Sequence, residues 1–210
     1  MGFFDKLFGK ETNTATTPEP VKVPEKLKIA IIIGSNREGR NAEAVGKWTH
    51  DFGVKRGDAV YELVDLADYK LPLLGAKLTD AKQAAAEIAI KAWSEKMASF
   101  DGYVFVAPEY NHAVGAALKN AIDYLNPEVN NKAASFVGYG SLGGARAIEN
   151  LRLIFGELQI ADVRTAVTFS LLTDFENMSV FKPADYHAAN ATAMFDQLLS
   201  WSGALKTTRN

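Results

Sequence analysis

The sequence predicts an α/β fold, in which helices cover both faces of a five-stranded parallel sheet and form a three-layer sandwich. Two observations indicate this fold. Strand-like and helix-like patterns alternate along the chain from Leu27 onward, which is typical of βαβ units. The chain has 210 residues, 48% of them hydrophobic, which is enough for one domain with a sizeable core.

The predicted strands are of two kinds, and the difference indicates their order in the sheet. Those at 28–33, 102–107 and 133–139 are nearly continuous apolar runs, as expected where helices cover both faces. Those at 59–65 and 163–169 alternate apolar and polar residues, which is typical of half-exposed edge strands. Edge positions for the second and fifth strands give the spatial order 2-1-3-4-5, which is the flavodoxin-like order.

Five helices are predicted between and after these strands. They are expected at about 41–56, 80–99, 115–125, 145–158 and 185–205. No apolar run reaches the roughly 18 residues that a membrane span needs, so we expect no integral membrane segment.

The first 26 residues differ in composition from the rest. Residues 11–26 are rich in threonine, proline and charge and lack apolar periodicity, which predicts a flexible linker. On a helix, Phe4, Leu7 and Phe8 would share one face. Two interpretations of residues 1–10 are therefore possible: a short docking helix or a frayed end. We therefore predict a tail at 1–26 and one domain at 27–210.

Composition and charge exclude several kinds of site. The chain has no cysteine, which excludes disulfides, thiolate zinc sites, iron–sulfur clusters and cysteine nucleophiles. A formal net charge of −2 offers no basic field for nucleic acid. No histidine has metal-ligand spacing, and no secretory signal is recognised at the start, so we expect a cytoplasmic protein without a metal site.

Three loops carry residues that the fold alone does not require. In an open parallel sheet, ligands bind outside the carboxyl ends of the strands, where the strand order reverses. The loops at 34–41, 108–113 and 140–146 leave the first, third and fourth strands, so the predicted order makes them neighbours there.

The first loop has the groups that bind an anion. Ser35 offers a hydroxyl, Arg37 and Arg40 offer charged forks, and Asn41 stands at the expected start of a helix. The triphosphate pattern G-x-x-x-x-G-K-[ST] is incomplete, because Arg40 and Asn41 replace its lysine and hydroxyl. A terminal monophosphate fits best, and a plain helix cap with two solvated arginines is the alternative.

The second loop follows an apolar strand that is expected to end at Ala107. Pro108 would close that strand, Tyr110 offers a flat aromatic surface, and the amide of Asn111 can donate and accept at a heterocycle edge. Glu109 and His112 invite an acid–base interpretation, but we assign neither of them a proton transfer.

The third loop consists of Ser141, Leu142, Gly143 and Gly144 after Gly140. Adjacent glycines let backbone N–H groups converge on an electron-rich ligand edge. We expect the N–H groups near Gly143 and Gly144 to do so.

The same loop nearly copies the serine-hydrolase pattern G-x-S-x-G, with Ser141 as the nucleophile. Tyr139 stands where the first glycine belongs, while Asp174 and His187 could supply the acid and base. A hydrolase would leave the first two loops unexplained, and we do not favour it.

Four stretches in order resemble those of the NADPH-dependent FMN reductase family, which also includes quinone, azo-dye and chromate reductases. They are Gly34-Ser35-x-Arg37, Pro108-Glu109-Tyr110-Asn111, residues 117–125 (ALKNAIDYL) and Ser141-Leu142-Gly143-Gly144. The resemblance covers residues 27–205. It implies that the first loop binds the FMN phosphate and that the other two border the isoalloxazine ring. Many members have serine at the position of Arg40, which leaves that contact open.

The resemblance also implies the chemistry. FMN would pass two electrons from NADPH or NADH to a small acceptor, such as a quinone, free flavin, azo dye or metal oxyanion. Because the flavin carries the reaction, we assign no catalytic side chain. A homodimer or homotetramer is expected, and the long segment 171–183 could cover a neighbour's flavin. The alternative is a flavodoxin-type electron carrier that does not turn over NAD(P)H.

Overall fold

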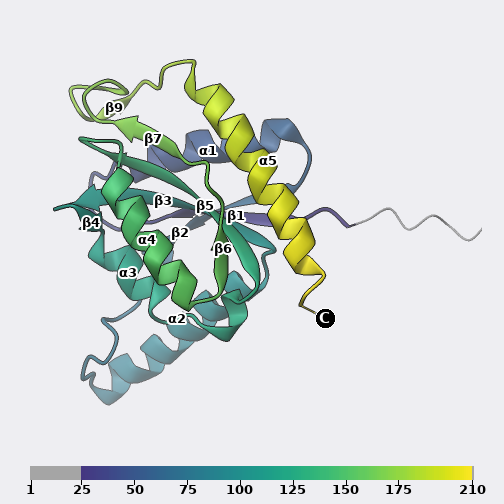
Figure 1. Ribbon diagram of the computed structural model, residues 1–210. Helices are drawn as coiled ribbons and strands as arrows, with labels where there is room; N and C mark the ends of the chain where they lie inside the picture. The colour runs from purple at the N-terminus through teal and green to yellow at the C-terminus, as the bar shows by residue number, and fades with distance from the viewer. Residues whose placement is uncertain (1–24, 210) are drawn as a thin grey trace, which may run out of the picture.

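The computed structural model describes residues 25–209, which form a twisted sheet with helices on both faces (Figure 1). Most of the predicted tail at 1–26 lies outside the described residues. The strands are β1 (Lys28–Ile33), β2 (Val60–Asp65), β3 (Gly102–Tyr110), β4 (Ala113–Val114), β5 (Lys132–Gly140), β6 (Ile160–Asp162), β7 (Val167–Ser170), β8 (Phe175–Glu176) and β9 (Val180–Phe181). The helices are α1 (Ala42–Arg56), α2 (Asp80–Ala98), α3 (Ala116–Ile122), α4 (Ala145–Glu157) and α5 (His187–Lys206), with short 3-10 turns η2 (Leu66–Asp68) and η3 (Pro127–Val129).

The predicted strand order is confirmed. The sheet runs β2-β1-β3-β5-β6, and every one of these neighbours is parallel. All residues of β5 are buried, whereas buried and exposed residues mix along β2, as the sequence predicts for a central and an edge strand.

The predicted fifth strand at 163–169 is wrong in its bounds. It is divided into β6 and β7, which pair with successive parts of β5. Between the two pairings β5 advances three residues, from Ala134 to Val137, whereas its neighbour advances five, from Asp162 to Val167. The extra residues form a bulge.

Side chains from two helices satisfy the backbone of this bulge in place of the sheet. Arg152 of α4 donates to the carbonyls of Val163 and Arg164, each at 3.0 Å. The Thr165 N–H donates to Gln197 Oε1 of α5 at 3.1 Å. Because these partners lie outside the strand, 11 to 32 residues away, alternation within the strand could not reveal the break.

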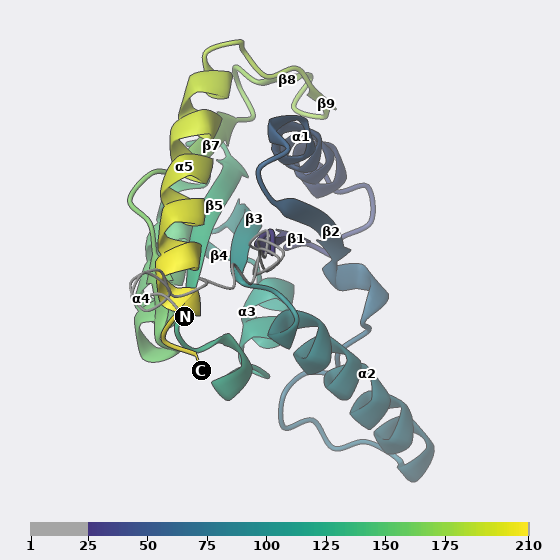
Figure 2. The same cartoon turned by 90° about the vertical axis from the view of Figure 1, so that its right-hand side faces the viewer.

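Two apolar clusters hold the helices to the sheet, one on each face. Helices α1 and α5 cover one face, where Met194 and Phe195 are fully buried against the strands. Helices α2, α3 and α4 cover the other, around Trp93, Phe105 and Phe155. Figure 2 shows the amino-terminal part of α2 and the segment before it extending beyond the sheet.

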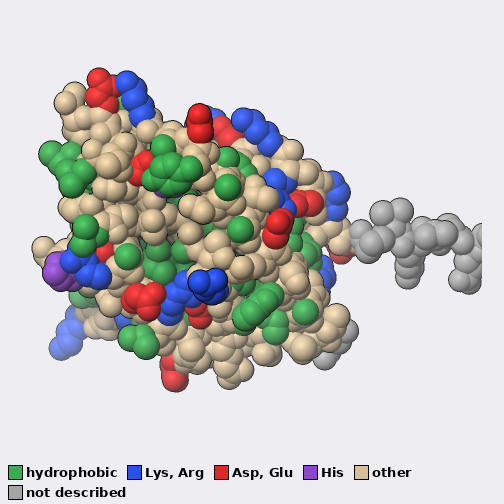
Figure 3. Space-filling model, turned by 45° about the horizontal axis from the view of Figure 1, so that its top comes forward, with side chains coloured by type: hydrophobic (Ala, Val, Ile, Leu, Met, Phe, Trp, Pro, Cys, Tyr) green, Lys and Arg blue, Asp and Glu red, His purple; other side chains and the backbone are tan. Residues whose placement is uncertain are grey.

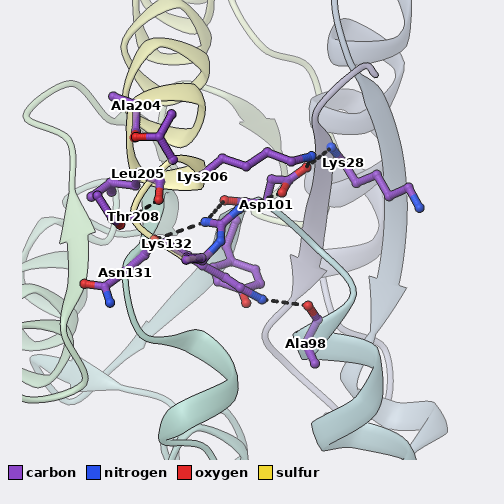
Figure 4. A network of polar contacts seen from close by, with 12 residues as sticks. Lys28, Ala98, Asp101, Asn131, Lys132, Ala204, Leu205, Lys206 and Thr208 are labelled. Carbon is purple, nitrogen blue, oxygen red and sulfur yellow. Dashed lines mark hydrogen bonds and ion pairs between the residues drawn. The ribbon is translucent and has the colours of Figure 1, made fainter. Parts of the chain in front are cut away.

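A polar network joins the end of α5 to the amino edge of the sheet (Figure 4). Asp101, just before β3, accepts hydrogen bonds from the Lys28 N–H, from Lys206 at 3.0 Å and from Arg209 at 2.7 Å. Burial alone would raise the pKa of Asp101, but these partners lower it. The carboxylate therefore fastens both β1 and α5 to this edge.

Lys132 is buried beside this network, over the ring of Tyr103. Its Nζ donates to the carbonyls of Met97 at 3.1 Å and Ala98 at 2.8 Å, at the end of α2. These two carbonyls accept from both N–H groups of a neutral amine, whereas the third N–H of an ammonium would need another acceptor. Burial, followed by the charge of Arg209, lowers the pKa of Lys132 to about 8.

We predict that Lys132 makes stability depend on pH. Between pH 8 and 10.5 the unfolded chain binds a proton at this site that the folded protein does not, so raising the pH through this range stabilises the fold. Relative to Lys132→Met, the free energy of unfolding of the parent protein should rise by about 3 kcal/mol across this window. Urea unfolding at pH 7, 9 and 10.5 measures it.

Lys28→Met is the matched control for this prediction, since the Lys28 side chain is exposed. It measures what the loss of an exposed ammonium does at each pH, and the change with pH for Lys132→Met should exceed it. A pH-independent difference for Lys132→Met would contradict the prediction.

Candidate functional site

The three predicted loops meet at the carboxyl edge of β1, β3 and β5. The Gly34 N–H donates to the Val106 carbonyl at 2.9 Å, and Ser35 Oγ lies 3.4 Å from the Tyr110 hydroxyl. From the third loop, the Arg146 N–H donates to Glu109 at 3.0 Å. On the face shown in Figure 3, acidic and basic side chains are mixed and no continuous basic area appears.

Close packing fixes the start of the first loop. A Cβ on Gly34 would lie 2.7 Å from both the Val106 carbonyl and a methyl group of Leu118. The next residue, Ser35, is buried, with 3% of its surface exposed. Its Oγ accepts a hydrogen bond from the Arg37 N–H at 3.4 Å. The hydroxyl lies at the base of a turn.

Arg37 is exposed, with its guanidinium 5.8 Å from the centre of the Tyr110 ring. No carboxylate in the described part of the chain lies within ion-pair distance of it. Arg37 thus has its charge available to a ligand.

Arg40 is bound within the protein. Its Nε and Nη2 reach Glu43 at 3.1 and 3.0 Å, its Nη1 reaches Asp65 at 2.9 Å, and it also contacts the Ser35 carbonyl and the second oxygen of Asp65. Five contacts match the five N–H donors of a guanidinium. Burial alone would lower the pKa of Arg40, but Asp65 and Glu43 raise it. Arg40 therefore links the loop to the end of β2.

Asn41 stands at the start of α1, as predicted, and its side chain makes no capping hydrogen bond within the described residues. Its amide donates to the Met178 carbonyl at 2.9 Å. Met178 lies in the predicted loop 171–183, in which β8 and β9 form a hairpin with Asn177 and Met178 at positive φ. The hairpin contributes a wall beside the first loop.

The second loop differs from the prediction. Pro108, Glu109 and Tyr110 continue β3, and Glu109 and Tyr110 pair with β4, while Asn111 and His112 form the turn with φ of 48° and 67°. Two adjacent left-handed residues are the requirement of a tight hairpin. Tyr110, which is 36% exposed, is consequently held on a strand.

Glu109 connects this hairpin to the third loop. Its side chain is 5% exposed and accepts from Arg146 Nε at 2.7 Å and from the Arg146 N–H at the start of α4. Burial alone would raise the pKa of Glu109, whereas Arg146 lowers it, so the group stays ionised. His112 Nε2 lies 2.7 Å from Arg146 Nη1 and accepts from it.

The third loop exposes backbone donors. Gly143 and Gly144 have φ of 69° and 76°, and a Cβ on Gly143 would lie 2.7 Å from Thr168. The Gly143 N–H donates to the Gly140 carbonyl at 3.1 Å, which closes a turn. Within the described chain the N–H groups of Ser141 and Leu142 have no acceptor, and both residues are exposed.

The residues of the hydrolase alternative do not assemble. Asp174 and His187 form a buried pair at 2.7 Å. The other ring nitrogen, His187 Nδ1, is buried without a partner in the described structure, and no hydrogen bond joins the ring to Ser141. Asp174 instead accepts from the Ser170 N–H at 2.9 Å and fixes the base of the β8–β9 hairpin.

Tyr139, one residue before the third loop, belongs to the core. It lies near the end of β5 beside Pro108, is 5% exposed, and packs in the apolar cluster on the α1 and α5 face of the sheet.

The donor set suits an anion joined to a flat, electron-rich ring. A phosphate fits the unpaired Arg37, the Ser35 hydroxyl and the start of α1. A ring edge fits Tyr110 and the free N–H groups of Ser141 and Leu142. The described residues include no group of three or more His, Cys, Asp or Glu that could hold a metal ion. None of the described helices is long and apolar enough to cross a membrane.

The chain is similar to known flavin-dependent reductases. The chain is 34% identical to an NAD(P)H-dependent FMN reductase of Schizosaccharomyces pombe over 175 residues, which are 77% of this chain and 84% of the relative. It is 32% identical to the quinone reductase of Escherichia coli K12 over 136 residues, which are 62% and 70% of the two chains.

A solved structure shows the same fold. The flavoenzyme NAD(P)H:(acceptor) oxidoreductase FerB of Paracoccus denitrificans superposes with a TM-score of 0.65 at 19% identity, over 85% of this chain and 98% of that one. The sequence model described as NADPH-dependent FMN reductase matches residues 27–174. The chain belongs to the NADPH-dependent FMN reductase family.

Proposed function

We propose that this protein is an FMN-dependent NAD(P)H oxidoreductase that reduces a small acceptor. The observation that carries the proposal is the meeting of the three loops, with Arg37 at one end and N–H groups at the other that have no partner among residues 25–209. The chemistry that FMN supplies when bound is two-electron transfer from NADPH or NADH to an oxidised molecule. Family membership supports both cofactors.

The phosphate end of the site would consist of Ser35, Arg37 and the first turn of α1 next to Asn41. The exposed guanidinium of Arg37 can approach a phosphate with two parallel hydrogen bonds. The free N–H groups at the helix start add partial positive charge.

The ring end would lie between the 108–111 hairpin and the 140–144 turn. The N–H groups of Ser141 and Leu142 are free to stabilise negative charge on the electron-rich edge of the ring. Gly143 and Gly144 would act through their backbone angles, which form the turn, and Tyr110 would wall the ring. Glu109 would hold the two loops together through Arg146.

Arg40 would serve as a positioning residue. Its five donors are occupied, and two of them hold Asp65 while another holds the Ser35 carbonyl. It would thereby shape the turn that presents Ser35 and Arg37 to the phosphate.

Relatives named as FMN reductase and quinone reductase support a flat or flavin-like acceptor, with azo dyes and metal oxyanions as further candidates. The exposed side chains of Leu142, Leu172 and Met178 lie on the 140–144 turn and the 171–183 segment. They suit an apolar acceptor and equally a second subunit, and we propose a homodimer or homotetramer. We further propose that residues 27–210 form the catalytic domain and that the protein acts in the cytoplasm, where NAD(P)H is available.

The competing function is electron carriage between proteins without NAD(P)H turnover. Anaerobic addition of NADPH, and separately of NADH, to the FMN-loaded protein distinguishes the two. We expect rapid bleaching of the yellow flavin colour, followed by recovery when a quinone, free FMN, an azo dye or chromate is added. A flavin that stays oxidised would contradict the reductase proposal and favour the carrier.

We predict that Arg37→Ala weakens FMN binding about tenfold to a hundredfold, because a charge-assisted contact to the phosphate is lost. Riboflavin, which lacks the phosphate, should bind as it does to the parent protein. Fluorescence titration of the flavin measures both dissociation constants.

Arg164→Ala is the matched control, since Arg164 is also exposed but lies at the β6–β7 bulge. It should leave both constants unchanged. FMN binding to Arg37→Ala at parental affinity would refute the assignment of the first loop.

We predict that Asp65→Asn weakens FMN binding about tenfold, although it removes a negative charge near the phosphate end. Loss of the ion pair releases Arg40 and loosens the turn at Ser35. A direct Arg40–phosphate contact predicts the reverse, because the released guanidinium would bind FMN more tightly.

The exposed Asp68→Asn, three residues away, removes the same charge without touching Arg40. Its FMN affinity should stay within twofold of the parent. Titration of both variants at two salt concentrations separates the loss of the turn from a general change in charge.

A further inference from the structure

An apolar groove with a volume of about 780 Å³ lies along the amino-terminal half of α2. Two parts of the chain line most of it: the segment 68–72 after β2, and residues 82–92 of α2, where most of the lining side chains are alanines. This half of the helix extends beyond the sheet (Figure 2), and among residues 80–92 only Ala86 is buried. The described part of the chain therefore leaves the groove uncovered.

The groove has a fixed shape before any partner binds. Tyr69 from the first side packs edge-to-face against Trp93 of α2, with ring centres 5.0 Å apart. Trp93 is fully buried, and its Nε1 donates to the Ala121 carbonyl at 2.8 Å. A partner would therefore meet a surface that loses little conformational freedom on binding.

Large apolar side chains project beside the groove. Ile88 of the groove lining is 71% exposed. Leu73 and Leu74 are 73% and 52% exposed, and they lie between two lining residues, Pro72 and Leu78. Exposed apolar side chains that gather on one surface mark a site of interaction.

Hydrogen bonds from α3 and the residues after it hold the two leucines in this position. Asn120 Nδ2 donates to the Pro72 carbonyl at 2.7 Å, and Asn120 Oδ1 accepts from the Leu74 N–H at 2.8 Å. The Tyr124 hydroxyl also donates to the Pro72 carbonyl, at 3.1 Å. The leucines are thus kept in contact with water, which is unfavourable for an isolated chain.

The shape of this surface suits a second copy of the same chain. Projecting side chains and a groove with a floor of small side chains lie on one surface. In an interface with a twofold axis, the same surface of both copies meets. The projecting side chains of each copy can then fill the groove of the other.

The charges of the groove are also self-complementary. Asp68 and Lys82 both line it, and neither has an ion-pair partner among residues 25–209. A twofold axis can bring Asp68 of each copy to Lys82 of the other. A lipid or nucleic-acid surface would select positive charge alone, whereas this groove has charges of both signs.

We propose that residues 68–78 and 82–92 form the interface of a homodimer with a twofold axis. This inference rests on the oligomer in the proposed function, but not on the flavin chemistry. Lys70 borders the groove and also a pocket of about 220 Å³ that Asn36 of the first loop lines. The interface would therefore lie next to the flavin site.

Sedimentation velocity of the cofactor-free, full-length chain over a range of protein concentrations tests the proposal. The parent chain should associate into dimers or larger oligomers. Ile88→Glu and Leu73→Asp should each raise the dissociation constant of the dimer about a hundredfold or more, because a twofold interface contains each new charge twice. Both positions are exposed, so the circular dichroism spectrum should stay that of the parent.

Leu153→Glu is the matched control. Leu153 is 80% exposed on α4, and it lies outside the groove. This substitution also introduces a carboxylate in place of an exposed apolar side chain on a helix. The dissociation constant of the dimer should stay within about threefold of the parent value.

Charge reversal tests the twofold arrangement itself. Lys82→Glu and Asp68→Lys each bring like charges together in their own dimer, which should weaken it about tenfold. In a mixed dimer of the two variants, one ion pair is the original and the other is reversed. An equimolar mixture should therefore associate within about threefold of the parent.

Four results would overturn the proposal. They are a parent chain that is monomeric at every concentration, which would leave the groove to a different partner; a dimer that Ile88→Glu and Leu73→Asp leave intact; a dimer that Leu153→Glu dissociates instead; and a mixture that associates as weakly as the two single variants. A dimer that behaves as expected but whose FMN-loaded form is not bleached by NADPH or NADH would contradict only the proposed function.

Discussion

The pairing of β3 with both β1 and β5 is the constraint on which the arrangement of the site depends. Both pairings are parallel, so the three strands end at one edge and the three loops leave it together. The strands are buried along almost their whole length, and a shift of register by one residue would turn their buried side chains to the other helix layer. Packing on two faces thus fixes a polar site that contributes little to the core.

Within that frame, the protein pairs most of its own charges at the site edge. Glu109 is bound by Arg146, and Asp65 is bound by Arg40. These pairs join loops that come from different strands, so they restrict the loops before any ligand is present. Preorganisation of this kind reduces what the loops lose in conformational freedom when a ligand binds. It also leaves Arg37 as a charge without a partner in the described chain, at the point where we assign the phosphate.

The sequence predicted the regular elements well because each is determined locally. Periodicity placed β1 at its observed bounds, and α1, α2 and α4 within a residue of theirs. The features that it missed depend on contacts across the chain. The β6–β7 bulge depends on Arg152 and Gln197, and the partner of Arg40 is 25 residues away on β2. The hairpin after Ala107 is an intermediate case, because Asn111 tolerates the left-handed region, yet nothing local predicts that His112 adopts it too.

The two edges of the sheet show how the same kinds of residue come to have different roles. At the amino edge, Asp101 accepts hydrogen bonds from a backbone N–H and from two cationic side chains, and these bonds hold α5 to the sheet. At the carboxyl edge, Arg37 and the N–H groups of Ser141 and Leu142 are exposed and lack a partner among the described residues. Water satisfies such exposed donors in the free protein, so they are compatible with the fold and available to a ligand. An anion joined to an electron-rich ring can replace that water at both ends of the site, and this is the physical reason why the edge suits a flavin phosphate rather than a neutral ligand.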